Sequence, residues 1–212
     1  MGISNFSIVM GFCGLAFSYM AATALWGLPA VIGEGIGIVA AVIYAVLCIG
    51  YGRKILVQPE AVRQEWESPE GAPFFATFGM ASVLLAAVLE PWAFLLSAIV
   101  WVIGVVALFA CIFLLWRRWL KEKQDAAHLT PAWLLILISP LTVPVAGNSL
   151  KLFGYQELTL FSLSIGLGLG LPGVMFLLKE AVFDKHFGPG LLIVLTLSLI
   201  HISEPTRQEA IS

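Results

Sequence analysis

Long apolar stretches alternate with short polar ones along this chain, and most are about as long as a bilayer is thick. Six are complete, with approximate bounds 5–26, 29–51, 73–89, 92–116, 130–148 and 158–178. A transmembrane helix needs about 20 mainly apolar residues, so each run predicts one membrane-crossing helix. A seventh run starts at Gly188 and becomes polar after about 12 residues, which is too short to cross.

The connections between these runs alternate in length, which predicts that the helices pair as hairpins. The connections after the first, third and fifth runs are short, and the one after the fifth carries Lys151 as its only basic residue. Those after the second, fourth and sixth runs are longer and charged, and the first of them, 52–72, reads as a polar loop. We therefore predict an all-α integral membrane protein built from helical hairpins, with six complete transmembrane helices and a truncated seventh.

The basic residues gather in the loops on one side of the predicted bundle. They are Arg53, Lys54, Arg63, Arg117, Arg118, Lys121, Lys123, Lys179 and Lys185, against Lys151 alone on the other side. Basic residues close to span ends stay in the cytoplasm. We therefore expect a multi-pass protein of the plasma (inner) membrane whose N-terminus is cytoplasmic.

The composition agrees with the apolar pattern and excludes a soluble protein. Of 212 residues, 60% are hydrophobic and 11% are charged, whereas a soluble domain carries about 25% charged residues. The net charge of -2 gives no basic field for nucleic acid. The lipid bilayer is therefore the expected partner, and nucleic acid is not.

The sequence offers little material for catalysis. It contains no HExxH, GxSxG or P-loop motif, and Asp184 and His186, in one charged loop, are weak evidence for a metal. Cys13, Cys48 and Cys111 all lie inside apolar runs, as buried small hydrophobes do. We therefore expect no enzyme, no cofactor and no metal site.

Three of the runs carry small residues at helical spacing. These are Gly11, Gly14, Ser18 and Ala21 in the first, Gly33, Gly37 and Ala41 in the second, and Ser162, Gly166, Gly170 and Gly173 in the sixth. Small residues let helix backbones approach closely in a membrane. We interpret the second and sixth faces as packing surfaces, and leave open whether the first packs or lines a narrow pore.

The fifth run is interrupted by Pro140 and Pro144. Each proline lacks an N–H, so the carbonyls of Ile136 and Pro140 lose their usual donors and must face protein or water rather than lipid. Polar side chains stand beside the break: Ser139, Thr142 and Asn148. Broken helices at this depth mark ion and substrate paths in many transporters, but a kink that neighbouring groups satisfy is an equal alternative.

Several segments resemble the tellurite-resistance/dicarboxylate transporter family, which includes yeast malate and sulfite transporters and plant slow anion channels. They are FSIVMGFCGLAFSY, KILVQPEAVRQEWESP, FFATF, TPAWLLILISPLTVPVAG and GLGLGLPGVMFLLKEAVF, in this order within residues 5–198. The resemblance implies a ten-helix bundle of five hairpins that forms homotrimers when full length. Its odd-numbered helices would line a pore for small anions, either inorganic anions or dicarboxylates.

Carried onto this chain by helix position, the resemblance gives the pore-lining candidates Gly14, Ser18, Thr77, Ser82, Ser139, Pro140, Thr142, Pro144 and Asn148. The family closes its pore with a phenylalanine on the ninth helix, which this chain does not contain. Two alternatives stay open: a non-transporting membrane scaffold, and an intramembrane enzyme whose catalytic residues lie in the missing part.

The last residues do not fit a membrane protein of this kind. The polar segment HISEPTRQEAIS at 201–212 follows the short seventh run, and SLIHISEPTRQ at 198–208 resembles translated sequencing-adapter read-through. We therefore expect residues 1–198 to be the N-terminal part of the transmembrane domain and residues 199–212 to be a non-native tail. A pore wall that lacks its last helices is expected to be inactive.

Overall fold

Helices make up the secondary structure of the described chain, and their arrangement is that of a membrane bundle. The computed structural model describes residues 2–68, 71–121, 133–145 and 155–183, and it has no strand within them. Five of its helices are long and apolar enough to cross a membrane. The prediction of an all-α membrane protein is confirmed, while the seventh apolar run and the tail lie outside the described residues.

The helices follow the apolar runs closely. In chain order they are η1 (Ile3–Asn5), α1 (Phe6–Trp26), α2 (Ala30–Val57), α3 (Pro59–Glu67), η2 (Ala72–Phe74), α4 (Phe75–Leu89), α5 (Phe94–Lys121), α6 (Trp133–Ile138), η4 (Ser139–Thr142) and α8 (Tyr155–Phe183). The predicted spans one to four and six therefore correspond to α1, α2, α4, α5 and α8. The fifth is a shorter apolar helical segment, Trp133–Val145.

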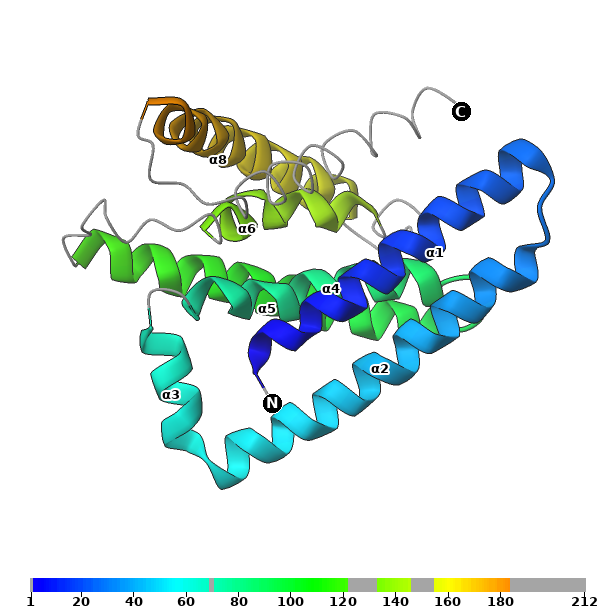
Figure 1. The fold of residues 1–212 in the computed structure, drawn as a ribbon, viewed down its shortest axis with the longest axis horizontal. Helices are drawn as coiled ribbons and strands as arrows, with labels where there is room; N and C mark the ends of the chain where they lie inside the picture. Colours follow the sequence, from blue (N-terminus) through cyan, green and yellow to red (C-terminus); the bar gives the residue numbers. More distant parts are fainter. Residues whose placement is uncertain (1, 69–70, 122–132, 146–154, 184–212) are drawn as a thin grey trace.

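The spans pack as three hairpins, with α4 at the centre (Figure 1). The pairs are α1 with α2, α4 with α5, and the α6–η4 segment with α8. Spans one, three and five, which are α1, α4 and the α6–η4 segment, also contact one another. Helix α4 packs against α1 on one side and against η4 and α6 on the other. Contacts among spans two, four and six, which are α2, α5 and α8, are sparse in the described part of the chain. The odd-numbered spans therefore form one continuous row.

The connection between the second and third spans is a helix, so the interpretation of 52–72 as a loop is wrong. Helix α2 continues beyond the predicted end at Tyr51 as far as Val57. Pro59 then occupies the first position of α3, which has one apolar and one polar face. Proline is favoured at that position because its fixed φ suits the first turn and its missing N–H is not needed there. The many charges in α3 concealed its helical spacing.

The backbones of α4 and α5 approach each other closely at Gly79 and Gly104. A Cβ atom added to Gly79 would lie 3.0 Å from the Gly104 carbonyl oxygen and 2.8 Å from the Leu108 Cβ. A Cβ atom added to Gly104 would lie 2.7 Å from the Ser82 Cβ. Each glycine therefore makes room for the other helix, as small residues do in membrane helix pairs.

Replacing Gly79 by Ala is expected to push α4 and α5 apart and to destabilise the protein by about 1–3 kcal/mol, the usual effect of overpacking. The matched control is Gly35→Ala in α2, where an added Cβ meets nothing within 4 Å. That control should be neutral or slightly stabilising, because alanine favours a helix over glycine. Thermal unfolding in detergent checks both, and equal melting temperatures for the two variants would contradict the close contact.

Candidate functional site

The fifth span changes its helical geometry at the two prolines. Helix α6 ends at Ile138, and the chain continues as the 3-10 turn η4. Three hydrogen bonds replace those that a regular helix would make here. The Ser139 hydroxyl donates to the Ile136 carbonyl at 2.8 Å, the Thr142 hydroxyl donates to the Ser139 carbonyl at 2.8 Å, and the Val143 N–H donates to the Pro140 carbonyl.

This pattern answers the question raised by the two prolines. Both carbonyls deprived of a donor, those of Ile136 and Pro140, are satisfied within the segment itself. The side chains of Ser139 and Thr142 are 0% and 2% exposed, so protein surrounds the break. An unsatisfied carbonyl in an apolar setting costs about 1–3 kcal/mol in proteins, and the two hydroxyls avoid that cost for their partners. The break is therefore a kink whose polar groups are satisfied.

The small face of α8 covers this kink. A Cβ atom added to Gly166 would lie 2.5 Å from the Leu141 Cδ2, and one added to Gly173 would lie 2.5 Å from the Leu137 Cδ1. Gly170 faces Ile138 in the same way, at 3.3 Å. The interpretation of the small face in the sixth apolar run as a packing surface is confirmed. The element that packs against it is the broken helix α6–η4.

The second apolar run packs in the same manner on the other side of the bundle. A Cβ atom added to Gly37 would lie 2.5 Å from Val88 of α4, and one added to Gly33 would lie 3.1 Å from Tyr19 of α1. Its packing role is therefore confirmed too.

The hydroxyls predicted on the third span lie between helices. Thr77 donates to the carbonyls of Phe74, in its own helical turn, and Ile3, at the start of the chain. Ser82 is hydrogen-bonded to the Tyr44 hydroxyl of α2 at 2.7 Å and to the Phe78 carbonyl. Every described residue of α4 is at least partly buried, so these hydroxyls join helices in this structure. Their pore-lining role stays a prediction.

The small face of α1 is arranged differently, because nothing covers it within the described residues. A Cβ atom added to Gly11 or Gly14 would meet nothing within 4 Å. Ser18, one turn further on, is exposed, and its hydroxyl donates to the Gly14 carbonyl at 2.9 Å. The sequence left two interpretations of this face open, helix packing and the lining of a pore. Packing against a described helix is not observed, and the lining of a pore stays a prediction.

The sequence candidates therefore fall into three separate groups. Ser139, Pro140 and Thr142 share one turn with Pro144 close by, Thr77 and Ser82 lie on α4, and Gly14 and Ser18 lie on α1. Asn148 lies outside the described residues. No group of three or more His, Cys, Asp or Glu side chains that could hold a metal occurs in the part of the chain that is described.

Two polar side chains that brace the site escaped the sequence analysis. The Trp101 indole N–H of α5 donates to the Val143 carbonyl, with an N–O distance of 3.4 Å, directly after the kink. Tyr44 supplies the partner of Ser82. The position of Tyr44 near the middle of an apolar span could have indicated such a contact, since a buried tyrosine hydroxyl needs a hydrogen-bond partner.

Replacing Ser139 by Ala should destabilise the protein by about 1–3 kcal/mol, because the buried Ile136 carbonyl loses its donor. Replacing Pro140 by Ala restores a backbone N–H that can donate to the same carbonyl. The double variant Ser139→Ala, Pro140→Ala should therefore be more stable than the sum of the two single effects predicts. Thermal unfolding of all four proteins checks this, and strictly additive effects would contradict the assigned role of the hydroxyl.

Comparison with known proteins places these features in a family. Residues 1–198 match the SLAC1 family, described as voltage-dependent anion channels. The chain is also similar to the tellurite resistance protein TehA homolog of Haemophilus influenzae, with 24% identity over 185 residues. That alignment covers 85% of this chain and 53% of the relative, so the chain spans about half the length of the curated relative. The resemblance to the tellurite-resistance/dicarboxylate transporters is confirmed, and the chain is a multi-pass membrane protein that belongs to the SLAC1 anion channel family.

Proposed function

We propose that this chain contributes to a transmembrane pathway for small anions, with a wall formed by α1, α4 and the α6–η4 segment. The observation that carries the proposal is the continuous row of odd-numbered spans, each backed by its even-numbered hairpin partner. The membership of the chain in an anion channel family supports transport rather than catalysis. The substrates proposed are inorganic anions or dicarboxylates.

The chemistry of the proposed wall suits passage rather than tight binding. No Lys, Arg, Asp or Glu occurs within α1, α4, α6 or η4. An anion on this wall would meet hydroxyl groups and peptide dipoles instead of a fixed positive charge. Binding would be weak enough for release, which conduction requires.

Within this wall we assign different roles to the three groups of candidates. Gly14 and Ser18 supply the open surface, because their face of α1 is uncovered. Ser139, Pro140, Thr142 and Pro144 fix the shape of the broken helix. Thr77 and Ser82 hold α4 in place through hydrogen bonds to η1 and α2.

We further propose the topology of the full-length protein. The described basic side chains near span ends meet at one end of the bundle, where Lys54 of α2 and Arg118 of α5 both bind α3. Basic residues near span ends mark the cytoplasmic side. The N-terminus is accordingly placed in the cytoplasm, the protein in the plasma (inner) membrane, and the full-length assembly as a homotrimer.

Replacing Gly14 by Leu should lower anion flux from liposomes by about tenfold or more, because the side chain narrows an uncharged passage. The measurement compares the full-length protein with and without the substitution, at matched amounts of inserted protein.

The matched control is Gly35→Leu on α2, which also has open space at its Cβ position but belongs to an even-numbered span. Flux of the control should stay within about twofold of the unmodified protein, since α2 stands behind the proposed wall. Equal loss of flux in both variants, or no loss in Gly14→Leu, would contradict the assignment of α1 to the wall.

A further inference from the structure

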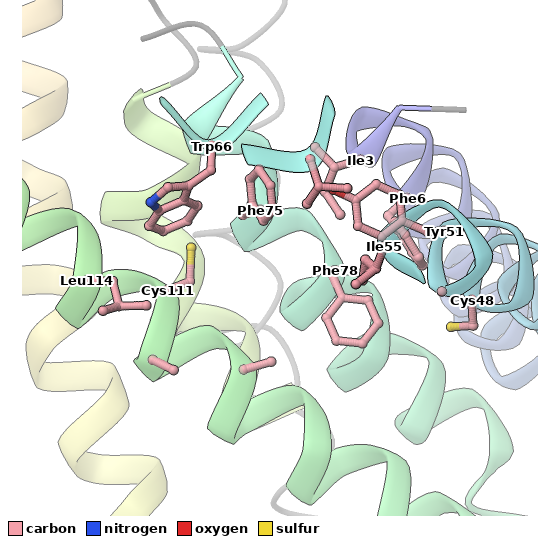
Figure 2. Close-up of a pocket in the computed structure, with 14 residues that line it drawn as sticks. Ile3, Phe6, Cys48, Tyr51, Ile55, Trp66, Phe75, Phe78, Cys111 and Leu114 are labelled. Atoms are coloured by element: carbon pink, nitrogen blue, oxygen red, sulfur yellow. The ribbon is translucent and has the colours of Figure 1, made fainter. Parts of the chain in front are cut away.

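An apolar groove lies between α2 and α5 and over α4, and the start of the chain, with Ile3 and Phe6, also lines it (Figure 2). Its volume is about 440 Å³, within the range typical of small-molecule sites. Six of the residues that line it are Phe6, Cys48, Tyr51, Trp66, Phe78 and Leu114. Figure 2 shows side chains from both flanking helices and from α3 around the same space.

One end of the groove is closed by α3, which is bound to both flanking helices. Glu65 accepts hydrogen bonds from Lys54 at 2.5 Å and from Tyr51 at 3.1 Å, which ties α3 to α2. The Arg118 guanidinium donates to the carbonyls of Trp66 and Glu67 at 2.8 and 2.6 Å, which ties α3 to α5. Because these bonds hold both sides, the groove has a fixed width at its closed end.

Positive charge surrounds this closed end. On α5, the groove residues Cys111 and Leu114 are followed at helical spacing by Arg117 and Arg118. Arg117 is exposed and forms no ion pair with another described residue. The nearby carboxylates of Glu65 and Glu67 are already paired with Lys54 and Arg63. The residual charge at the closed end is therefore positive.

We propose that this groove binds one acyl chain of an anionic phospholipid, whose phosphate lies against Arg117. An apolar groove that ends in cations matches a molecule with an apolar tail and an anionic head. Basic pockets between membrane helices bind such head groups. A second copy of this chain is a poorer match, because it would bring the same cations to the same place.

The test measures lipid that stays bound to the full-length protein through detergent exchange, by native mass spectrometry. With phosphatidylglycerol added, we expect about one retained molecule per chain, and fewer with zwitterionic phosphatidylcholine, since the head group is attracted by charge. Ala110→Trp fills the groove and should lower retention by about tenfold. Val46→Trp is the matched control, because Val46 is exposed on α2 and does not line the groove. Arg117→Gln should reduce the preference for phosphatidylglycerol.

A second measurement does not depend on the folding of Ala110→Trp. Phosphatidylglycerol with a brominated acyl chain should quench part of the tryptophan fluorescence at low lipid ratios, and Trp66→Phe should remove that part, because Trp66 lines the groove. Equal retention of both lipids, or equal losses in Ala110→Trp and Val46→Trp, would overturn the proposal. It would also be overturned if Ala110→Trp changed the size of the assembly and left bound lipid unchanged, since a second copy would then occupy the groove.

Discussion

The requirement that every backbone polar group be satisfied without water governs this fold. Most spans meet it through ordinary helical hydrogen bonds, but Pro140 and Pro144 remove two donors in the fifth span. The Ser139 hydroxyl replaces the donor to the Ile136 carbonyl, and the Val143 N–H of the tighter turn replaces the donor to the Pro140 carbonyl. The side chains of Leu137 and Leu141 project from this segment toward α8, so the facing surface of α8 must be narrow. The glycine face of α8 meets that demand.

The same constraint explains why α4 stands at the centre. Its hydroxyls each find a partner on another element, Thr77 on the Ile3 carbonyl and Ser82 on Tyr44. Ser97 of α5 returns a hydrogen bond to the Ala86 carbonyl of α4. Between these polar contacts the helix backbones approach closely at Gly79 and Gly104. Membrane helices associate through such packing and hydrogen bonds, because lipid is as apolar as leucine. A central helix held in this way fixes the positions of α1 and η4 on either side.

Much of this architecture could be predicted from the sequence, because apolar length and small-residue spacing report directly on spans and packing faces. The five long described spans and the glycine contacts of α2 and α8 follow from such patterns. Helix α3 was missed because a short amphipathic helix at the end of a span has the composition of a loop. The partner of Ser82 was beyond prediction, since a hydroxyl pattern does not reveal which way each helix is rotated. The uncovered face of α1 likewise depends on tertiary packing.

The most direct test of the proposed wall is the reactivity of single cysteines with a membrane-impermeant, water-soluble thiol reagent. The three native cysteines, Cys13, Cys48 and Cys111, are first replaced by alanine. Single cysteines are then placed at Ser18 on α1 and at Gly168 on α8, which are both exposed positions. If the small face of α1 borders a water-filled path, Ser18→Cys reacts much faster than Gly168→Cys, and a permeant anion slows its reaction. Equal, slow reaction at both positions would show that lipid covers the α1 face and would contradict the assignment of α1 to the anion pathway.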